Sequence, residues 1–282
     1  MTGVQHLTAN GVDFAYLSEG DGPLVVLFHG FPDTAHTWDH AMPALARAGY
    51  RAVAPFMRGY APTAIPADGK YDSDTLGADI LAIIAALGDK PAIVVGHDWG
   101  ASASYSAAAL GPERVRLLVT IAIPHPKSLK PNPLMLWRLR HFVRLRRPSA
   151  AAKIRAGDYA YIDKLWRRWS PSWREIPASE TAAVKAAFRE PGSLEAACGY
   201  YAALELPKLP RSHRKNIAVP TVSFAGEHDM LPPRLYEKAR HCFDAAYEVV
   251  QVPGGHFMHR EHPDTFAAEL VRVIRDHDAR AR

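Results

Sequence analysis

The chain has 282 residues, 48% of them hydrophobic and 22% charged, which is typical of one large α/β domain or of a core with an insertion. It has only two cysteines, Cys198 and Cys242, so neither a disulfide framework nor a cysteine metal site is indicated. No basic N-terminal segment leads into an apolar one, and no apolar run is long enough to span a bilayer, which predicts a soluble, cytoplasmic protein.

The net charge of +5 is unevenly distributed along the chain. Residues 125–215 contain 19 Lys and Arg against 7 Asp and Glu, whereas the remainder contains 15 and 22. A basic segment could attract an anionic substrate, a membrane or a nucleic acid. Its arginines lie among Trp and Leu at near-helical spacing, which favours a solvated helix face. We therefore expect no nucleic-acid partner and no membrane partner.

Short apolar runs predict strands at residues 12–17, 24–28, 52–54, 92–95, 117–121, 221–225 and 247–252. Helical patterns lie between most of them, at residues 37–48, 74–87, 101–110, 234–241 and 263–275. This alternation predicts an α/β protein whose mostly parallel sheet is covered by helices on both faces.

The alternation stops after residue 121 and resumes at residue 221. The intervening segment is rich in Trp, Tyr, Arg and Pro, and it has helical but no strand patterning. It is too long for an ordinary connection. We expect it to form a helical cap at residues 125–211, over the carboxyl ends of the strands of a core at residues 1–124 and 212–282.

The sequence AIVVGHDWGA, at residues 92–101, predicts a buried strand, a sharp turn and an alanine-rich helix, with Asp98 at the apex. Such a turn brings two backbones close together, which explains Gly96 and Gly100 on either side. This is the nucleophile-elbow pattern with a carboxylate at the apex. A carboxylate there would attack carbon and form an alkyl ester. The alternative role for Asp98 is a helix N-cap.

Two further polar residues follow predicted strands, where ligands of open α/β sheets bind. Asp229 follows the strand at residues 221–225, and His256 follows the strand at residues 247–252. The order nucleophile, acid, histidine is that of the α/β-hydrolase arrangement. We prefer Asp229 because it is closest to the loop apex, and His256 because two glycines before it leave room for its ring. The competing residues of the same types are Glu227, His228, His259 and His262.

A fourth element, HGFPD at residues 29–33, follows the strand at residues 24–28. A loop amide beyond Gly30 can meet the amide of the residue after the nucleophile, and two such donors can hold an oxyanion. We assign these donors to the backbones of Phe31 and Trp99. This chemistry requires no cofactor and no metal.

The segments HGFPDT, VAPFMRGYAPT, VVGHDWGA, FAGEHDM and GGHFMHREHP resemble those of epoxide hydrolases in the α/β-hydrolase superfamily and of their haloalkane and fluoroacetate dehalogenase relatives. The resemblance covers nearly the whole chain and implies an α/β-hydrolase fold with a mostly parallel eight-stranded sheet and an inserted helical cap. It also implies Asp98 as the nucleophile, His256 as the base that activates water, and Asp229 as the acid that orients this base.

The cap residues bear on the choice between an epoxide and a halide. An epoxide oxygen needs a proton donor, which epoxide hydrolases supply from two cap tyrosines, whereas a halide needs N–H donors. Tyr201 resembles the second of these tyrosines, and Tyr200 is its alternative. His141 stands where the first is expected, and Tyr159 or Tyr161 could supply the missing hydroxyl.

The dehalogenase resemblance is weaker at two positions. The sequence His141-Phe142 resembles the histidine and tryptophan of fluoroacetate dehalogenases, but those enzymes have an arginine directly after the nucleophile, where this chain has Trp99. Phe31 replaces the asparagine or glutamate that haloalkane dehalogenases place after His-Gly.

We therefore predict hydrolysis of an epoxide to a vicinal diol through a covalent alkyl ester. The alternatives are hydrolytic cleavage of a carbon–halogen bond in a haloalkane or haloacid, and a hydrolase-fold binding protein without turnover. The expected partners are a small apolar organic substrate and water, and the sequence leaves a homodimer open.

Overall fold

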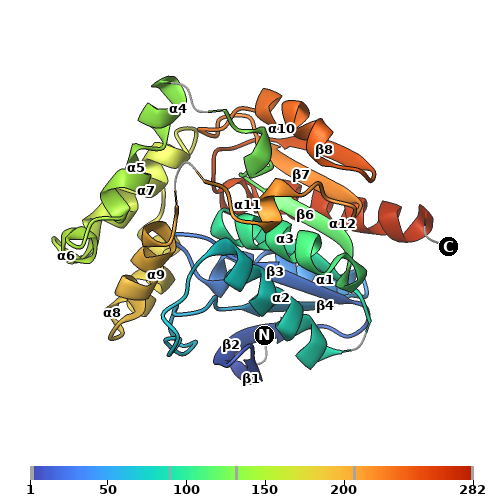
Figure 1. The fold of residues 1–282 in the computed structure, drawn as a ribbon, viewed down its shortest axis with the longest axis horizontal. Coiled ribbons are helices and arrows are strands. Elements are labelled where there is room, and N and C mark those ends of the chain that lie inside the picture. The colour runs from blue at the N-terminus through green and yellow to red at the C-terminus, as the bar shows by residue number, and fades with distance from the viewer. Residues whose placement is uncertain (1–2, 89, 131–132, 206–207, 281–282) are drawn as a thin grey trace.

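The structure, a computed structural model, describes residues 3–88, 90–130, 133–205 and 208–280 (Figure 1). One eight-stranded sheet has the strand order β1-β2-β4-β3-β5-β6-β7-β8. Its strands are β1 (Gln5–Ala9), β2 (Val12–Glu19), β3 (Leu24–Phe28), β4 (Arg51–Pro55), β5 (Ala92–His97), β6 (Val115–Ile121), β7 (Thr221–Gly226) and β8 (Tyr247–Val252). Strand β2 pairs antiparallel with β1 and β4, and all other neighbours are parallel. This arrangement confirms the predicted fold class.

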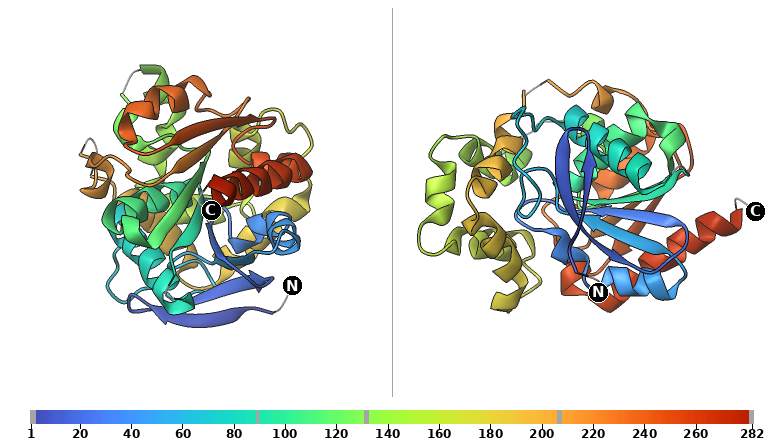
Figure 2. Two further views of the ribbon diagram at one scale, coloured as in Figure 1. Left: turned by 90° about the vertical axis from the view of Figure 1, so that its right-hand side faces the viewer. Right: turned by 90° about the horizontal axis from the view of Figure 1, so that it is seen from below.

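Helices cover both faces of the sheet (Figures 1 and 2). On one face, α1 (Ala41–Arg47) and α12 (Pro263–Arg280) share a core with Val25 and Leu27 of β3. On the other face, α2 (Ser73–Leu87) and α3 (Trp99–Leu110) share a core with Val26. Successive residues of a strand point to opposite faces, so both faces of these buried parallel strands are apolar.

A helical insertion connects β6 to β7, and Figure 1 shows it at the left of the sheet. Its helices are α4 (Pro133–Arg138), α5 (Arg140–Leu145), α6 (Ala150–Arg155), α7 (Ala160–Trp169), η4 (Ala178–Thr181), α8 (Ala182–Arg189) and α9 (Ser193–Ala202). We call α4 to α9 the insertion. It is helical, as predicted, and its boundaries as a separate cap at residues 125–211 stay a prediction.

The remaining short elements connect the core or follow its strands. They are η1 (Ala35–Trp38), η2 (Pro112–Arg114), η3 (Pro126–Ser128), η5 (Ser212–Arg214), α10 (Arg234–Lys238), η6 (Ala239–Cys242) and α11 (Met258–Glu261). In the part of the chain that the structure describes, no helix is long and apolar enough to cross a membrane.

The helix predicted at residues 37–48 is instead divided into η1 and α1. The hydroxyl of Thr37 and Nε2 of His259 share a hydrogen bond of 2.6 Å, which ties η1 to the segment after β8. Helix α1 starts afresh at Ala41, with Pro43 in its first turn, where a missing N–H breaks no intrahelical bond. Tertiary contact therefore overrides a continuous helical pattern.

Candidate active site

Asp98 occupies the turn between β5 and α3 with a backbone φ of 51°. Positive φ is uncommon for a residue other than glycine, and such strain is concentrated at functional sites. A Cβ atom on Gly96 would overlap the carbonyl oxygen of Gly100, and one on Gly100 would overlap that of Phe28. The two glycines thus permit the sharp reversal, as predicted. The Asp98 side chain makes no capping hydrogen bond to α3, which removes the support for the N-cap alternative.

Three strand ends bring Asp98, His256 and Asp229 together. Nε2 of His256 lies 3.4 Å from Oδ2 of Asp98, and its Nδ1 lies 3.3 Å from Oδ1 of Asp229. The side chains of His256 and Asp229 are fully buried, whereas 13% of the Asp98 side chain is exposed. The histidine ring therefore lies between two carboxylates, of which only Asp98 is partly exposed.

The competing acidic and histidine residues lie elsewhere. Glu227 and His228 are exposed, and Nε2 of His259 shares a hydrogen bond with the hydroxyl of Thr37. His262 lies 3.8 Å from Glu261 on the surface side of the last helices. None of these four side chains contacts Asp98.

One of the two predicted oxyanion donors contacts the carboxylate directly. The backbone N–H of Phe31 donates to Oδ1 of Asp98 at 2.9 Å. This approach depends on Gly30, because a Cβ atom there would overlap Cβ and Oδ1 of Asp98. Trp99 is the first residue of α3, so its N–H is among those that a helix leaves without an intrahelical partner.

The charges of the three groups are coupled. Burial raises the pKa of Asp98, but His256, His97 and the Phe31 amide outweigh burial and bring it below its ordinary value. Burial lowers the pKa of His256, yet the Asp229 and Asp98 carboxylates raise it to about 10. Asp98 is therefore ionised at neutral pH, which is the form that a nucleophilic carboxylate requires.

The insertion places Tyr201 and His141 above this triad. The Tyr201 ring lies 5.2 Å from the rings of both Phe31 and Trp99, and 6.1 Å from that of His141. Burial and the charge of Asp98 raise the pKa of Tyr201 well above its ordinary value, so its hydroxyl keeps its proton. Burial lowers the pKa of His141 to about 3, which leaves this ring neutral.

The hydroxyls of Tyr200 and Tyr159 are paired with backbone carbonyls rather than with Asp98. The hydroxyl of Tyr200 donates to the carbonyl of Arg58 at 2.8 Å, so this hydroxyl is already paired with the backbone. The hydroxyl of Tyr159 donates to the carbonyl of Phe188 at 2.9 Å. In both cases a buried backbone carbonyl accepts the hydrogen bond of a hydroxyl that the sequence analysis had considered as a proton donor.

Two further residues beside the triad were not predicted from the sequence. The ring of Trp169 lies 5.2 Å from that of His256 and 4.8 Å from that of His141, and its buried indole N–H has no partner among the described residues. The buried hydroxyl of Tyr60 likewise has no partner among the described residues. Burial is the largest cause of its raised pKa, and the charge of Asp98 raises this pKa further. Unpaired donors in a buried site are costly, which suits a ligand with acceptor atoms.

Within residues 3–88, 90–130, 133–205 and 208–280, no group of three or more His, Cys, Asp and Glu side chains could hold a metal ion.

A sequence profile of the α/β-hydrolase fold family matches residues 23–263, so the chain belongs to this family. It is 32% identical over 249 residues to the AB hydrolase superfamily protein YfhM of Bacillus subtilis, covering 84% of this chain and 86% of that protein. It is 28% identical to epoxide hydrolase A of Mycobacterium tuberculosis, with 94% and 95% of the two chains covered.

Solved structures agree with this assignment. A Klebsiella pneumoniae protein provisionally described as an epoxide hydrolase superposes with a TM-score of 0.84 at 28% identity, over 98% of this chain and 97% of that one. The epoxide hydrolase of Bacillus megaterium, at 23% identity, has the same fold with a TM-score of 0.84 over 97% and 99% of the two chains. The protein is thus an α/β-hydrolase enzyme that resembles epoxide hydrolases.

Proposed function

We propose that this enzyme hydrolyses small epoxides to vicinal diols through an ester on Asp98. The observation that carries the proposal is the position of this ionised carboxylate, which lies at the apex of the elbow between the Phe31 amide and the His256 ring. A serine esterase would need a hydroxyl there. A carboxylate instead displaces a leaving group from carbon.

In the first step, an Asp98 oxygen attacks an epoxide carbon and the carbon–oxygen bond of the ring breaks. The departing oxygen takes the electron pair of that bond and accepts the proton of the Tyr201 hydroxyl. The neutral His141 ring supplies a second hydrogen bond to the same oxygen. The raised pKa of Tyr201 supports this role, since it keeps the donor protonated until the oxygen develops negative charge.

In the second step, His256 takes a proton from water, and the resulting hydroxide attacks the carbonyl carbon of the ester. The amides of Phe31 and Trp99 stabilise the tetrahedral oxyanion. Collapse of this intermediate breaks the ester bond to the diol oxygen, which takes the proton from His256. Asp98 is left as a carboxylic acid and releases its proton, and Tyr201 takes up one proton, so that one water molecule supplies all the atoms added to the epoxide. Asp229 holds the histidine in the required orientation.

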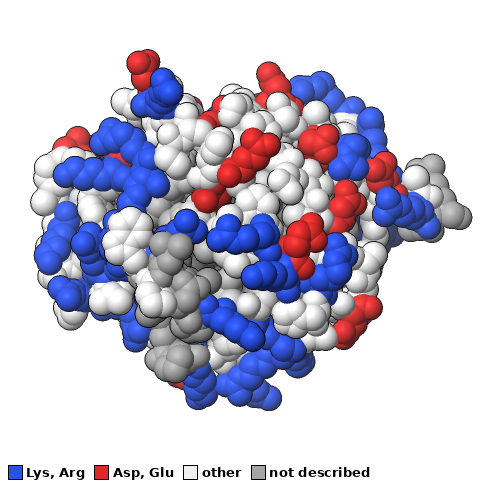
Figure 3. Space-filling model, turned by 90° about the horizontal axis from the view of Figure 1, so that it is seen from above, with Lys and Arg blue, Asp and Glu red and all other residues white. Residues whose placement is uncertain are grey.

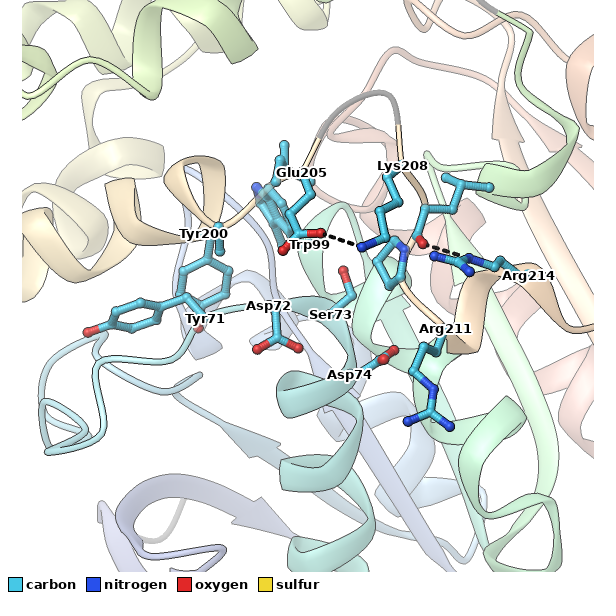
Figure 4. Close-up of a pocket in the computed structure, with 14 residues that line it drawn as sticks. Tyr71, Asp72, Ser73, Asp74, Trp99, Tyr200, Glu205, Lys208, Arg211 and Arg214 are labelled. Atoms are coloured by element: carbon cyan, nitrogen blue, oxygen red, sulfur yellow. Dashed lines mark hydrogen bonds and ion pairs between the residues drawn. The ribbon is translucent and has the colours of Figure 1, made fainter.

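We place substrate access at a pocket of about 180 Å³ between the start of α2 and the segment after α9 (Figure 4). Tyr71 and Ser73 line it on the core side, and Glu205 and Lys208 line it on the other side. Trp99 and Tyr200 line the same pocket, and the Trp99 ring packs against Tyr201 beside the nucleophile. A shift of this aromatic wall would connect the pocket to Asp98, and the insertion would act as the cap.

The decisive experiment compares wild type with His256→Ala on styrene oxide. We expect wild type to release diol, and the variant to accumulate an ester whose added mass maps to the peptide containing Asp98. Asp98→Asn should form no adduct, and His228→Ala, which changes an exposed histidine, should behave as wild type. Absence of an adduct on His256→Ala would exclude the two-step mechanism if wild type converts the substrate.

Hydrolytic dehalogenation is the second candidate, and the indole of Trp169 supports it. Halides are bound by N–H donors, and Trp169 offers a buried, unpaired one beside His256. Short haloalkanes and haloacids should therefore be tested in parallel with epoxides. Halide release that exceeds diol release, and that Trp169→Phe abolishes, would favour this candidate over epoxide hydrolysis.

A further inference from the structure

The outer side of α4 and α5 combines arginines with exposed apolar side chains. We call this surface the arginine face, and its members are Trp137, Arg140, Val143, Arg144 and Arg147. Within α5, Arg140 lies three residues from Val143 and four from Arg144, so these three share one side of the helix. Trp137 lies near the end of α4, and Arg147 lies two residues beyond the end of α5.

The positive charge of this face is not balanced by acids. The chain has no Asp or Glu from residue 133 to residue 157. Arg144 and Arg147 are exposed and form no ion pair with any described residue. Arg140 and Arg144 are also close to a third arginine, Arg168. Burial is the largest cause of the lowered pKa of Arg168, and the charges of Arg140 and Arg144 lower this pKa further. Figure 3 shows Lys and Arg gathered on the side of the molecule that the insertion forms.

The same face carries the two most exposed large hydrophobic side chains of the described chain. Trp137 is 61% exposed and Val143 is 60% exposed. The guanidinium of Arg140 lies 4.0 Å from the centre of the Trp137 ring. An exposed tryptophan and an aliphatic residue surrounded by arginines are typical of helices that lie in the interface of a bilayer.

In contrast to the expectation from the sequence that these arginines only form a solvated face, we propose that the arginine face docks the enzyme on membranes that contain anionic lipids, with Trp137 and Val143 entering the headgroup region. Unpaired arginines beside such a surface bind lipid phosphates and are attracted by its negative potential. A nucleic acid offers the same phosphate charge, but it has no apolar layer that would accommodate Val143.

The docked orientation is consistent with the proposed function, although the binding itself does not depend on it. His141 and Phe142 lie on the inner side of α5, and both contact the ring of Tyr201. One short helix therefore faces the site on one side and the bilayer on the other. Apolar epoxides partition into membranes, so docking would concentrate the substrate class near the enzyme.

The test is flotation of the full-length enzyme with vesicles, at about 0.1 M salt, where charges about 10 Å apart still interact. We expect binding to vesicles of phosphatidylcholine mixed with phosphatidylserine, and none to phosphatidylcholine alone. Arg144→Glu with Arg147→Glu should reduce the bound fraction at least tenfold, and Trp137→Ser with Val143→Ser should reduce it severalfold. None of these residues contacts Asp98, so diol release from a water-soluble epoxide should be unchanged.

The matched control is Arg47→Glu with Arg275→Glu, which makes the same charge change on exposed positions of α1 and α12. It should bind vesicles as wild type does. The proposal is overturned if wild type fails to float, if the control loses as much binding as the arginine-face variant, or if the Trp137 and Val143 changes have no effect. It is also overturned if the face binds a single-stranded RNA oligomer but not the vesicles.

Discussion

Asp98 and His256 influence each other's protonation, and in the proposed mechanism this coupling would give the two chemical steps different pH dependences. In the free enzyme, two carboxylates hold the pKa of His256 at about 10. In the proposed mechanism, ester formation would convert Asp98 to a neutral group and so remove one of the charges that raise this pKa. His256 should therefore become a competent base only after the first step.

We expect ester formation, measured by quenched single turnovers, to be independent of pH between about 5 and 8, because Asp98 remains ionised there. Ester hydrolysis should instead become faster as pH rises through the lowered pKa of His256. The two rates can be separated by following adduct mass and diol in the same reaction. A hydrolysis rate that does not change with pH would argue against His256 as the base.

The adjacent tyrosines of α9 provide a matched pair for the proton donor. Tyr201→Phe removes the hydroxyl that we propose as the proton donor, and we expect ring opening to slow by about 10²-fold or more. Tyr200→Phe removes a bond to the Arg58 carbonyl and should cost about 1 kcal/mol of stability while most activity remains. Rates on styrene oxide and urea unfolding distinguish these outcomes. Equal loss of activity in both variants would contradict the assignment.

Sequence reasoning succeeds at residues whose position is fixed by a strand end and fails where only packing decides. Asp98, Asp229 and His256 each follow a strand, so the parallel sheet itself brings them together. Trp169 ends α7 of the insertion, and its place in a helical pattern predicts burial but not which atom its indole N–H faces. The same limit applies to Tyr200, because the sequence does not show that its hydroxyl donates to the backbone carbonyl of Arg58.

At the scale of elements, the junction of β5 and α3 depends on the absence of two side chains. A Cβ atom on Gly100 would overlap the carbonyl oxygens of Phe28 and His29, which belong to backbone that cannot move aside cheaply. We expect Gly100→Ala to destabilise the protein by about 1–3 kcal/mol and to abolish ester formation by displacing Asp98. Gly88→Ala, where the added atom meets open space, is the control. Similar unfolding midpoints for the two variants would contradict this account.

The pattern of helices and strands was largely predictable because most parallel strands are continuously apolar. Strand β1 escaped prediction, since it is a five-residue edge strand with a partly exposed pattern. Helix α12 continues to Arg280, five residues beyond the end of its predicted range at residue 275, because polar contacts such as Arg272 with Asp276 stabilise its last turns. The spacing of apolar residues predicts neither a short, partly exposed edge strand nor the polar contacts that extend a helix.

At the scale of the whole molecule, several buried histidines make the fold sensitive to acid. Burial lowers the pKa of four of them to about 3 or 4, and these are His29, His97, His125 and His141. Unfolded histidine takes up its proton near pH 6.5. Below that pH the unfolded chain therefore binds more protons, and acid favours unfolding. Asp33 partly opposes this trend, because burial raises its pKa to about 7 and the folded chain then keeps a proton.

The four histidines less Asp33 give a difference of about three protons. Burial also lowers the pKa of His213 and of His259, so the unfolding free energy should fall by about 4 kcal/mol or more per pH unit between roughly pH 6 and 4. Stability should fall steeply as pH drops below about 6.5, which urea unfolding at a series of pH values measures. Above about pH 6.5 the raised pKa of His256, about 10, gives the opposite and smaller trend, because the folded chain then holds a proton that the unfolded chain has lost. His125→Asn keeps an acceptor for the Lys127 amide and should reduce the slope by about one proton. The exposed His228→Asn should leave the slope unchanged. If His125→Asn also leaves it unchanged, the acid sensitivity comes from carboxylates rather than from buried histidines.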